Sequence, residues 1–141
     1  MPSNMQDPRH LKVRPNYPHL SVGIGTATTI LLIYSSMQGI LNKPALISIT
    51  IFNLLFVFLL FPLEGPLFRK VYLLVAGNTV GLVWQVIKSS LGTVSIFYLG
   101  ADTSKILAVV IGPIIDLAWI VSVWSLSLSM LASSRKKEMR G

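Results

Sequence analysis

The sequence predicts an all-α membrane protein, which we expect to be a bundle of four transmembrane helices with short loops and both termini cytoplasmic. Two observations predict this fold class. First, 52% of the 141 residues are hydrophobic and only 12% are charged, whereas soluble domains carry about 25% charged residues. Second, the apolar residues gather in four long runs, and most basic residues gather in the tails and in the loop between the second and third runs.

Each apolar run reaches the roughly 20 residues that a helix needs to cross a bilayer. Only helices satisfy all of their backbone hydrogen bonds within such a run. Proline-containing turns, Asn42-Lys43-Pro44 and Glu64-Gly65-Pro66, separate the first three runs. The predicted spans are approximately residues 20–41, 45–63, 70–99 and 106–132, which together form one transmembrane domain, residues 20–132.

Two basic tails flank this domain. The N-terminal tail, residues 1–19, contains four prolines, which oppose a regular helix. The apolar run after it begins late and is long, so we interpret it as a retained helix and not as a secretory signal. The C-terminal tail, residues 133–141, is a short basic run beside the membrane. We expect it to contact anionic lipid headgroups through Arg135, Lys136, Lys137 and Arg140.

The positions of lysine and arginine predict the orientation of the chain. With four spans, both tails and the middle loop lie on one side of the membrane. That side carries nine of the twelve basic residues, and the other side carries Lys43, Lys88 and Lys105. Cytoplasmic segments hold the excess of basic residues, so both termini are predicted to be cytoplasmic. A bacterial cell membrane, an archaeal cell membrane and the endoplasmic reticulum all fit this multi-pass pattern.

The third run admits two interpretations. From Lys70 to Lys88 a helix rises about 27 Å, nearly a full hydrocarbon core, yet the sequence stays apolar as far as Leu99. Either one long, tilted helix ends at a short outer loop, residues 100–104, or the helix ends near Lys88 and an interfacial or re-entrant segment follows. We favour the long helix.

Composition excludes several classes of function. The chain has no cysteine, which excludes disulfides, thiolate metal sites and a cysteine nucleophile. Both histidines precede the first apolar run, and only five carboxylates are present. We therefore predict no metal, no cofactor and no enzymatic activity. Membrane topology and anionic lipid explain the net charge of +7, and we expect no nucleic-acid partner.

Asp116 is the strongest candidate for a functional residue. It lies about ten residues, or about 15 Å, into the fourth predicted span, where a charge costs several kcal/mol on insertion. No basic residue shares its predicted depth, because Lys88 is expected to extend to the outer headgroups. Asp116 is therefore either a proton or cation site or a hydrogen-bonded packing residue between helices.

Each predicted helix offers one polar residue near the middle of the membrane. At about 1.5 Å per residue, all four lie about 12 to 18 Å from the inner boundary. If they face inward, they form either a small polar binding site or a layer of hydrogen bonds between helices. This candidate intramembrane polar site consists of Thr28, Asn53, Asn78 and Asp116.

Two stripes of small or polar residues mark helix faces that are expected to contact protein. In the third span, residues three or four apart share one face, and the glycines among them let another backbone approach closely. We predict a helix-packing seam at Gly77, Gly81, Gln85, Lys88 and Gly92. A second stripe, in the fourth span, lies roughly opposite Asp116 and is the predicted face for a partner, through Ala118, Ser122, Ser125 and Ser129.

These features leave three hypotheses of function. Small size, short loops, two seams and scarce catalytic groups favour a non-enzymatic subunit, assembly factor or scaffold of a membrane complex. The alternative is a small oligomeric transporter or channel that uses Asp116. A membrane enzyme acting on lipid would need reactive groups at an interface, and only His19, Glu64, Arg69 and Lys70 offer them. The partners expected for the favoured hypothesis are lipid, other membrane subunits or a second copy of the chain.

Overall fold

A computed structural model of the chain describes residues 17–37, 39 and 42–141, and all regular structure in these residues is helical. The four helices are α1 (Tyr17–Ser36), α2 (Lys43–Leu60), α3 (Leu67–Leu99) and α4 (Ala101–Glu138). The prediction of an all-α chain with four helices is thereby confirmed. Most of the predicted N-terminal tail, residues 1–16, lies outside the described residues.

Three of the helices are long and apolar enough to cross a membrane, namely α2, α3 and the part of α4 up to Ser134. The first helix, α1, has 20 residues, but among the described residues it does not reach the same mean hydropathy. Its sequence explains the difference, because α1 carries more glycine, threonine and serine than α2 does.

Prolines set the ends of α2 and the start of α3. Pro44 lies in the first turn of α2, where its missing N–H would have no partner within the helix. Pro62 follows the end of α2, and α3 begins directly after Pro66. The turn between α2 and α3 therefore occupies six residues, 61–66.

The third helix continues without interruption through Lys88 to Leu99, as the long-helix interpretation expects. The chain then reverses at the single residue Gly100, whose φ of +83° favours glycine. Asp102 and Ser104 already belong to the first turn of α4. The predicted outer loop, residues 100–104, is thus reduced to one residue, because glycine alone makes the reversal and Asp102 suits a helix N-terminus.

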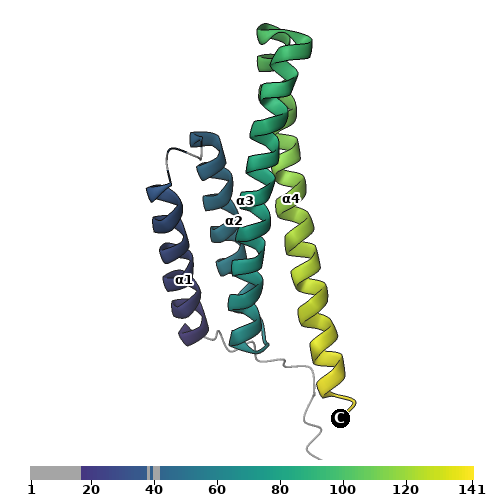
Figure 1. Ribbon diagram of the computed structural model, residues 1–141. Coiled ribbons are helices and arrows are strands. Elements are labelled where there is room, and N and C mark those ends of the chain that lie inside the picture. The colour runs from purple at the N-terminus through teal and green to yellow at the C-terminus, as the bar shows by residue number, and fades with distance from the viewer. Residues whose placement is uncertain (1–16, 38, 40–41) are drawn as a thin grey trace, which may run out of the picture.

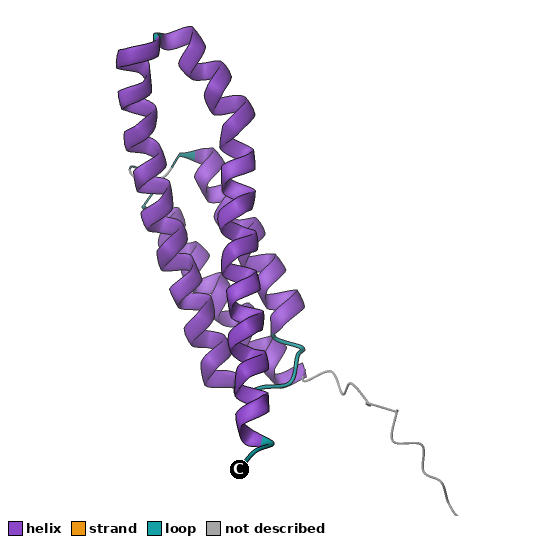
Figure 2. Ribbon diagram, turned by 90° about the vertical axis from the view of Figure 1, so that its right-hand side faces the viewer, coloured by secondary structure: helices purple, strands orange, loops and turns teal. Residues whose placement is uncertain are grey.

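The four helices lie side by side, and consecutive helices run in opposite directions (Figure 1). Helix α1 contacts α2 and α3, whereas α4 contacts α3 and α2; no contact joins α1 to α4 within the described residues. Helices α3 and α4 form the longer hairpin, which extends well beyond the adjacent ends of α1 and α2 (Figure 1, Figure 2). All four helices are therefore packed together only in the half of the molecule that lies nearer the C-terminus.

Aromatic side chains of α2 form the centre of the core. Phe52 and Phe56 are each 1% exposed, and the ring centroid of Phe52 lies 4.9 Å from that of Trp119 in α4. Two glycines of α3 make room for these rings, since a Cβ atom on Gly77 would lie 2.5 Å from Phe52 and one on Gly81 would lie 2.7 Å from Trp119. Close packing of this kind is what holds helices together in lipid, where the surroundings are as apolar as the core.

The outer surface of the helices is apolar. Exposed hydrophobic side chains occur on all four helices and include Leu32, Phe58, Phe68, Phe97, Val109 and Leu126. Soluble monomers rarely expose contiguous apolar patches larger than a few hundred Å². With three helices of spanning length and hydropathy, this surface is that of a membrane protein.

Candidate functional site

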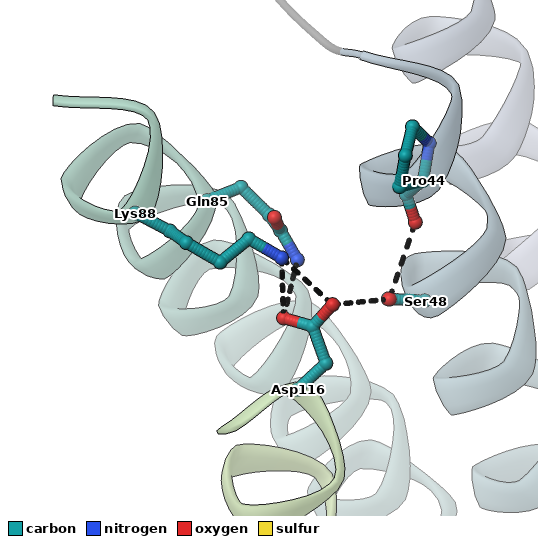
Figure 3. Close-up of polar contacts among 5 residues, drawn as sticks. All are labelled: Pro44, Ser48, Gln85, Lys88 and Asp116. Carbon is teal, nitrogen blue, oxygen red and sulfur yellow. Dashed lines mark hydrogen bonds and ion pairs between the residues drawn. The ribbon is translucent and has the colours of Figure 1, made fainter. Parts of the chain in front are cut away.

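The carboxylate of Asp116 is the centre of a polar cluster that joins three helices (Figure 3). Lys88 Nζ of α3 lies 2.7 Å from both carboxylate oxygens. Gln85 Nε2, one turn earlier on α3, donates to Oδ1 at 3.3 Å. From α2, Ser48 Oγ donates to Oδ2 at 2.9 Å. We call these four residues the Asp116 cluster.

The Asp116 cluster is largely but not wholly buried. Asp116 is 8% exposed, and the side chain of Lys88 is 28% exposed. The Ser48 hydroxyl also lies 3.2 Å from the Pro44 carbonyl oxygen, and its single hydrogen serves only one acceptor at a time. The carboxylate therefore has a cation and up to two neutral donors, which offset the cost of its burial.

The register of the α3–α4 hairpin explains why Lys88 pairs with Asp116. Lys88 lies twelve residues before Gly100 and Asp116 lies sixteen residues after it. In an antiparallel hairpin this places the two residues about four positions, or about 6 Å, apart along the axis, which the long lysine side chain bridges. The expected extension of Lys88 to the outer headgroups is not observed, because the reversal occurs at one glycine and brings the two charges together.

A second polar cluster lies deeper in the bundle and is uncharged. The amides of Asn53 and Asn78 exchange two hydrogen bonds, of 2.7 and 2.9 Å. Each amide also donates to a carbonyl one turn earlier in its own helix, that of Ile49 or Leu74, at 2.8 Å. Both hydrogens of each NH₂ group are thus used. The Tyr34 hydroxyl of α1 donates to the backbone carbonyl of Asn78 at 3.1 Å, so this pair connects α1, α2 and α3.

The four residues predicted near the middle of the membrane do not form one site. Asn53 and Asn78 bond to each other, whereas Asp116 bonds to Ser48, Gln85 and Lys88. Thr28 is exposed, and its hydroxyl donates to the Ile24 carbonyl of its own helix at 2.8 Å. Residues of equal predicted depth therefore face in different directions: Asn53 and Asn78 face each other, Asp116 faces Lys88, and Thr28 faces outward.

The predicted seam of α3 divides into three parts. Gly77 and Gly81 pack against aromatic rings, as described above, and Gln85 and Lys88 donate to Asp116. A Cβ atom on Gly92 would meet nothing within 4 Å. The seam therefore ends at Lys88, at the level where the hairpin begins to extend past α2.

The predicted partner face of α4 is exposed along its length. Ala118, Ser122, Ser125 and Ser129 are all exposed. The Ser122 hydroxyl donates to the Ala118 carbonyl at 2.7 Å, so it presents little unpaired polarity to its surroundings. Asp116, Trp119 and Ile120 lie on the buried side of α4. We call the exposed stripe the serine face.

A third polar cluster, which the sequence did not predict, lies at the end of the bundle where α2 ends and α3 begins. Lys70 is fully buried. Its Nζ donates to the carbonyl of Phe61 at 2.9 Å and to the carbonyl of Leu63, and it lies 3.3 Å from His19 Nδ1 of α1. A lysine that donates to the last carbonyls of a helix stabilises that helix end. The sequence feature that could have predicted this contact is the short turn between α2 and α3, which brings Lys70 back against the end of α2.

The basic C-terminal tail begins as a continuation of α4, which ends at Glu138. Lys136, Lys137 and Arg140 are exposed, and the side chain of Arg135 lies outside the described residues. Within the described ranges, 17–37, 39 and 42–141, no three histidine or acidic side chains are grouped so that they could hold a metal ion.

No protein-family model, no curated protein and no solved structure matches this chain.

Proposed function

We propose that this chain is a non-enzymatic subunit, assembly factor or scaffold of a larger membrane complex, and that it docks through the serine face of α4. The observation that carries the proposal is the serine face itself, whose four small residues are all exposed on the side of α4 away from the bundle. Among the three helices of spanning length and hydropathy, α4 is also the least buried, since 17% of its most apolar stretch is buried against 39% in α2 and in α3. Helix α4 is the longest of the four, yet one side of it is left with small side chains that suit close approach of another helix.

The same proposal includes four spans with both termini cytoplasmic. Two observations support α1 as a span. At about 1.5 Å per residue its 20 residues measure about 30 Å, which matches the hydrocarbon core. It also packs along two apolar helices, with Gly23 against the ring of Phe61 at one end and Tyr34 bonded to Asn78 at the other. The excess of basic residues supports the orientation.

The polar clusters support a structural role for the buried charges. Asp116 has a cation partner at 2.7 Å, and the amides of Asn53 and Asn78 use all of their hydrogens on each other and on their own helices. Such groups fix the positions of α2, α3 and α4 relative to one another. A scaffold needs this kind of fixed register, because its docking face must keep one shape.

Single cysteines test the docking face cleanly, because the chain has none of its own. We would introduce Ser122→Cys or Ser129→Cys, label the thiol with a maleimide that carries a benzophenone, and photo-cross-link in native membranes, because a benzophenone inserts into C–H bonds of any protein within reach. The matched control is Leu117→Cys, which is 60% exposed but lies about 140° round the helix from Ser122. We expect both serine-face variants to give cross-linked products and the control to give none. Equal yields from all three variants, or no product from any, would contradict the proposal.

A small oligomeric transporter or channel is the second candidate, and one observation favours it. The Lys88 side chain is partly exposed, so the carboxylate of Asp116 is not sealed from its surroundings. Asp116→Asn separates the two functions. A transporter that uses this carboxylate loses flux in sealed vesicles, whereas a scaffold keeps its cross-links at Ser122.

A further inference from the structure

A small hollow lies at the C-terminal end of the molecule, between the start of α3 and the last turns of α4. It is lined by Pro66, Arg69, Ser134 and Lys137 and has a volume of about 180 Å³. One water molecule needs roughly 10–15 Å³ by the same measure, so the hollow has room for a small polar group. The α2–α3 turn lies against α4 here, since a Cβ atom on Gly65 would lie 3.4 Å from the side chain of Leu131, and Figure 2 shows this turn as a loop beside the lower part of α4.

The lining of the hollow is positively charged. Arg69 comes from α3 and Lys137 from α4, and none of the four lining residues is acidic. Both side chains are exposed, so holding them there requires little loss of hydration. The guanidinium of arginine presents paired N–H donors that match phosphate oxygens, and lysine adds a compact charge. The Ser134 hydroxyl, which donates to the Met130 carbonyl at 2.9 Å, adds to the polar lining.

The start of α3 adds to the positive electrostatic potential at the hollow. Pro66 precedes the helix, and no side chain caps the first turn. The N–H groups of Leu67, Phe68 and Arg69 have no acceptor within the helix, and the partial positive charge of a helix N-terminus favours anions. The hollow, the two cations from different helices and the uncapped helix start all favour a phosphate group.

We propose that this hollow binds the phosphate of an anionic lipid headgroup, with Arg69 and Lys137 as its ligands. The position of the hollow favours lipid as the source. Phe68, the neighbour of Arg69, is 82% exposed, which suits contact with acyl chains directly beside the charged group. Free phosphate has the same chemistry and is distinguished by the experiment below.

The chain offers a matched control for this site. Lys136 is exposed like Lys137 and adjacent to it, but it does not line the hollow. A general attraction of the basic tail to anionic lipid treats the two lysines alike, because it depends on charge near the surface. A built site depends on Lys137 and not on Lys136. Neither substitution removes a buried group, so both variants are expected to fold.

The experiment titrates the full-length protein in neutral detergent with phosphatidylglycerol and measures bound lipid by native mass spectrometry. Phosphatidylcholine and inorganic phosphate are titrated in parallel. We expect Lys137→Gln and Arg69→Gln each to weaken phosphatidylglycerol binding about tenfold, as for the loss of one charge-assisted hydrogen bond. Lys136→Gln should change it less than about twofold. Inorganic phosphate should not displace the lipid at millimolar concentration.

Two results would overturn the proposal. Equal weakening by Lys136→Gln and Lys137→Gln would show general charge attraction and no site. Equal binding of phosphatidylglycerol and phosphatidylcholine would remove the preference for anionic lipid. Displacement of the lipid by inorganic phosphate that is lost in Lys137→Gln would support the phosphate chemistry and assign free phosphate as its source.

Discussion

The two halves of the molecule, on either side of the Asp116 cluster, are held together in different ways. Below the cluster, toward the C-terminus, all four helices pack around Phe52, Phe56 and Trp119, and glycines allow the rings to approach α3. Beyond the cluster only α3 and α4 continue (Figure 1). In that distal hairpin a hydrogen bond between the hydroxyls of Ser95 and Ser104, 2.7 Å apart, joins the two helices by their side chains.

Helix length explains the difference between the halves. At about 1.5 Å per residue, α3 measures about 50 Å and α1 about 30 Å, so the distal hairpin extends about 20 Å past α1 and α2. A tilt of 40°, about the largest seen for membrane helices, would shorten the length of α3 along the membrane normal only to about 38 Å. This is still longer than the hydrocarbon core, which is about 30 Å thick. The Asp116 cluster therefore lies where a four-helix bundle becomes a two-helix hairpin, and there it joins both helices of the hairpin to α2.

The largest predicted effect on the free energy of unfolding comes from breaking the ion pair between Lys88 and Asp116. Lys88→Met leaves Asp116 buried without its cation. Breaking a fully buried pair costs about 3–5 kcal/mol, and because the Lys88 side chain is 28% exposed we expect a loss of about 2–3 kcal/mol in the free energy of unfolding. The measurement is a detergent-denaturation titration of the purified protein. The double variant Lys88→Met with Asp116→Asn removes both charges and should lose less; an equal or greater loss would contradict a paired role.

Glycine substitutions compare the two halves directly. A Cβ atom on Gly77 would lie 2.5 Å from Phe52 and 3.0 Å from Val123, so Gly77→Ala should destabilise the protein by about 1–3 kcal/mol through overpacking. Gly92 lies in the distal hairpin with nothing within 4 Å. Gly92→Ala should stabilise by up to about 1 kcal/mol, because alanine favours helix. The same titration measures both, and equal destabilisation would remove the contrast.

The uncharged cluster should contribute less. Asn78→Leu removes the exchanged hydrogen bonds with Asn53, and hydrogen bonds between membrane helices average about 0.6 kcal/mol and reach about 1.7. We therefore expect a loss of about 1–2 kcal/mol in the free energy of unfolding. Thr28→Val is the control at similar depth, since Thr28 bonds only its own helix. If both variants behave alike, depth and not pairing decides the effect.

The smallest effect is predicted for the distal hairpin. Ser95→Ala removes the hydrogen bond to Ser104, and Ser104 can then donate to a carbonyl of its own helix. We expect a loss of about 0.5 kcal/mol or less, measured by the same titration. A loss as large as that of Lys88→Met would show that the distal hairpin, and not the Asp116 cluster, holds α3 against α4.

The helices were predictable from the sequence because their signals are local. Apolar runs, the prolines at 44, 62 and 66, and Gly100 mark where each helix begins or ends. The predicted loop at 100–104 was too long because polar residues such as Asp102 and Ser104 occur both in loops and in the first turn of a helix. Here both belong to the first turn of α4.

The polar contacts were not predictable to the same degree because they depend on facing directions. Residue counting gives depth, and it placed Thr28 at the depth of Asn53 and Asp116 although Thr28 faces outward. The partner of Asp116 depends on the hairpin register, which a one-residue error in the turn shifts by about 1.5 Å. Lys70 was predicted to lie at the inner interface, and its burial was not foreseen because it depends on the carbonyls of Phe61 and Leu63, which accept hydrogen bonds from its ammonium group.

The most direct test of the account is the mass of the particle taken from its own membrane in a polymer nanodisc, with and without a bulky residue on the serine face. We predict that the wild-type chain of 15.5 kDa is found in a larger protein assembly. Ser125→Trp should release it as a single chain, whereas Leu117→Trp should leave the assembly intact. A wild-type particle that contains one chain and no other protein would contradict the central claim.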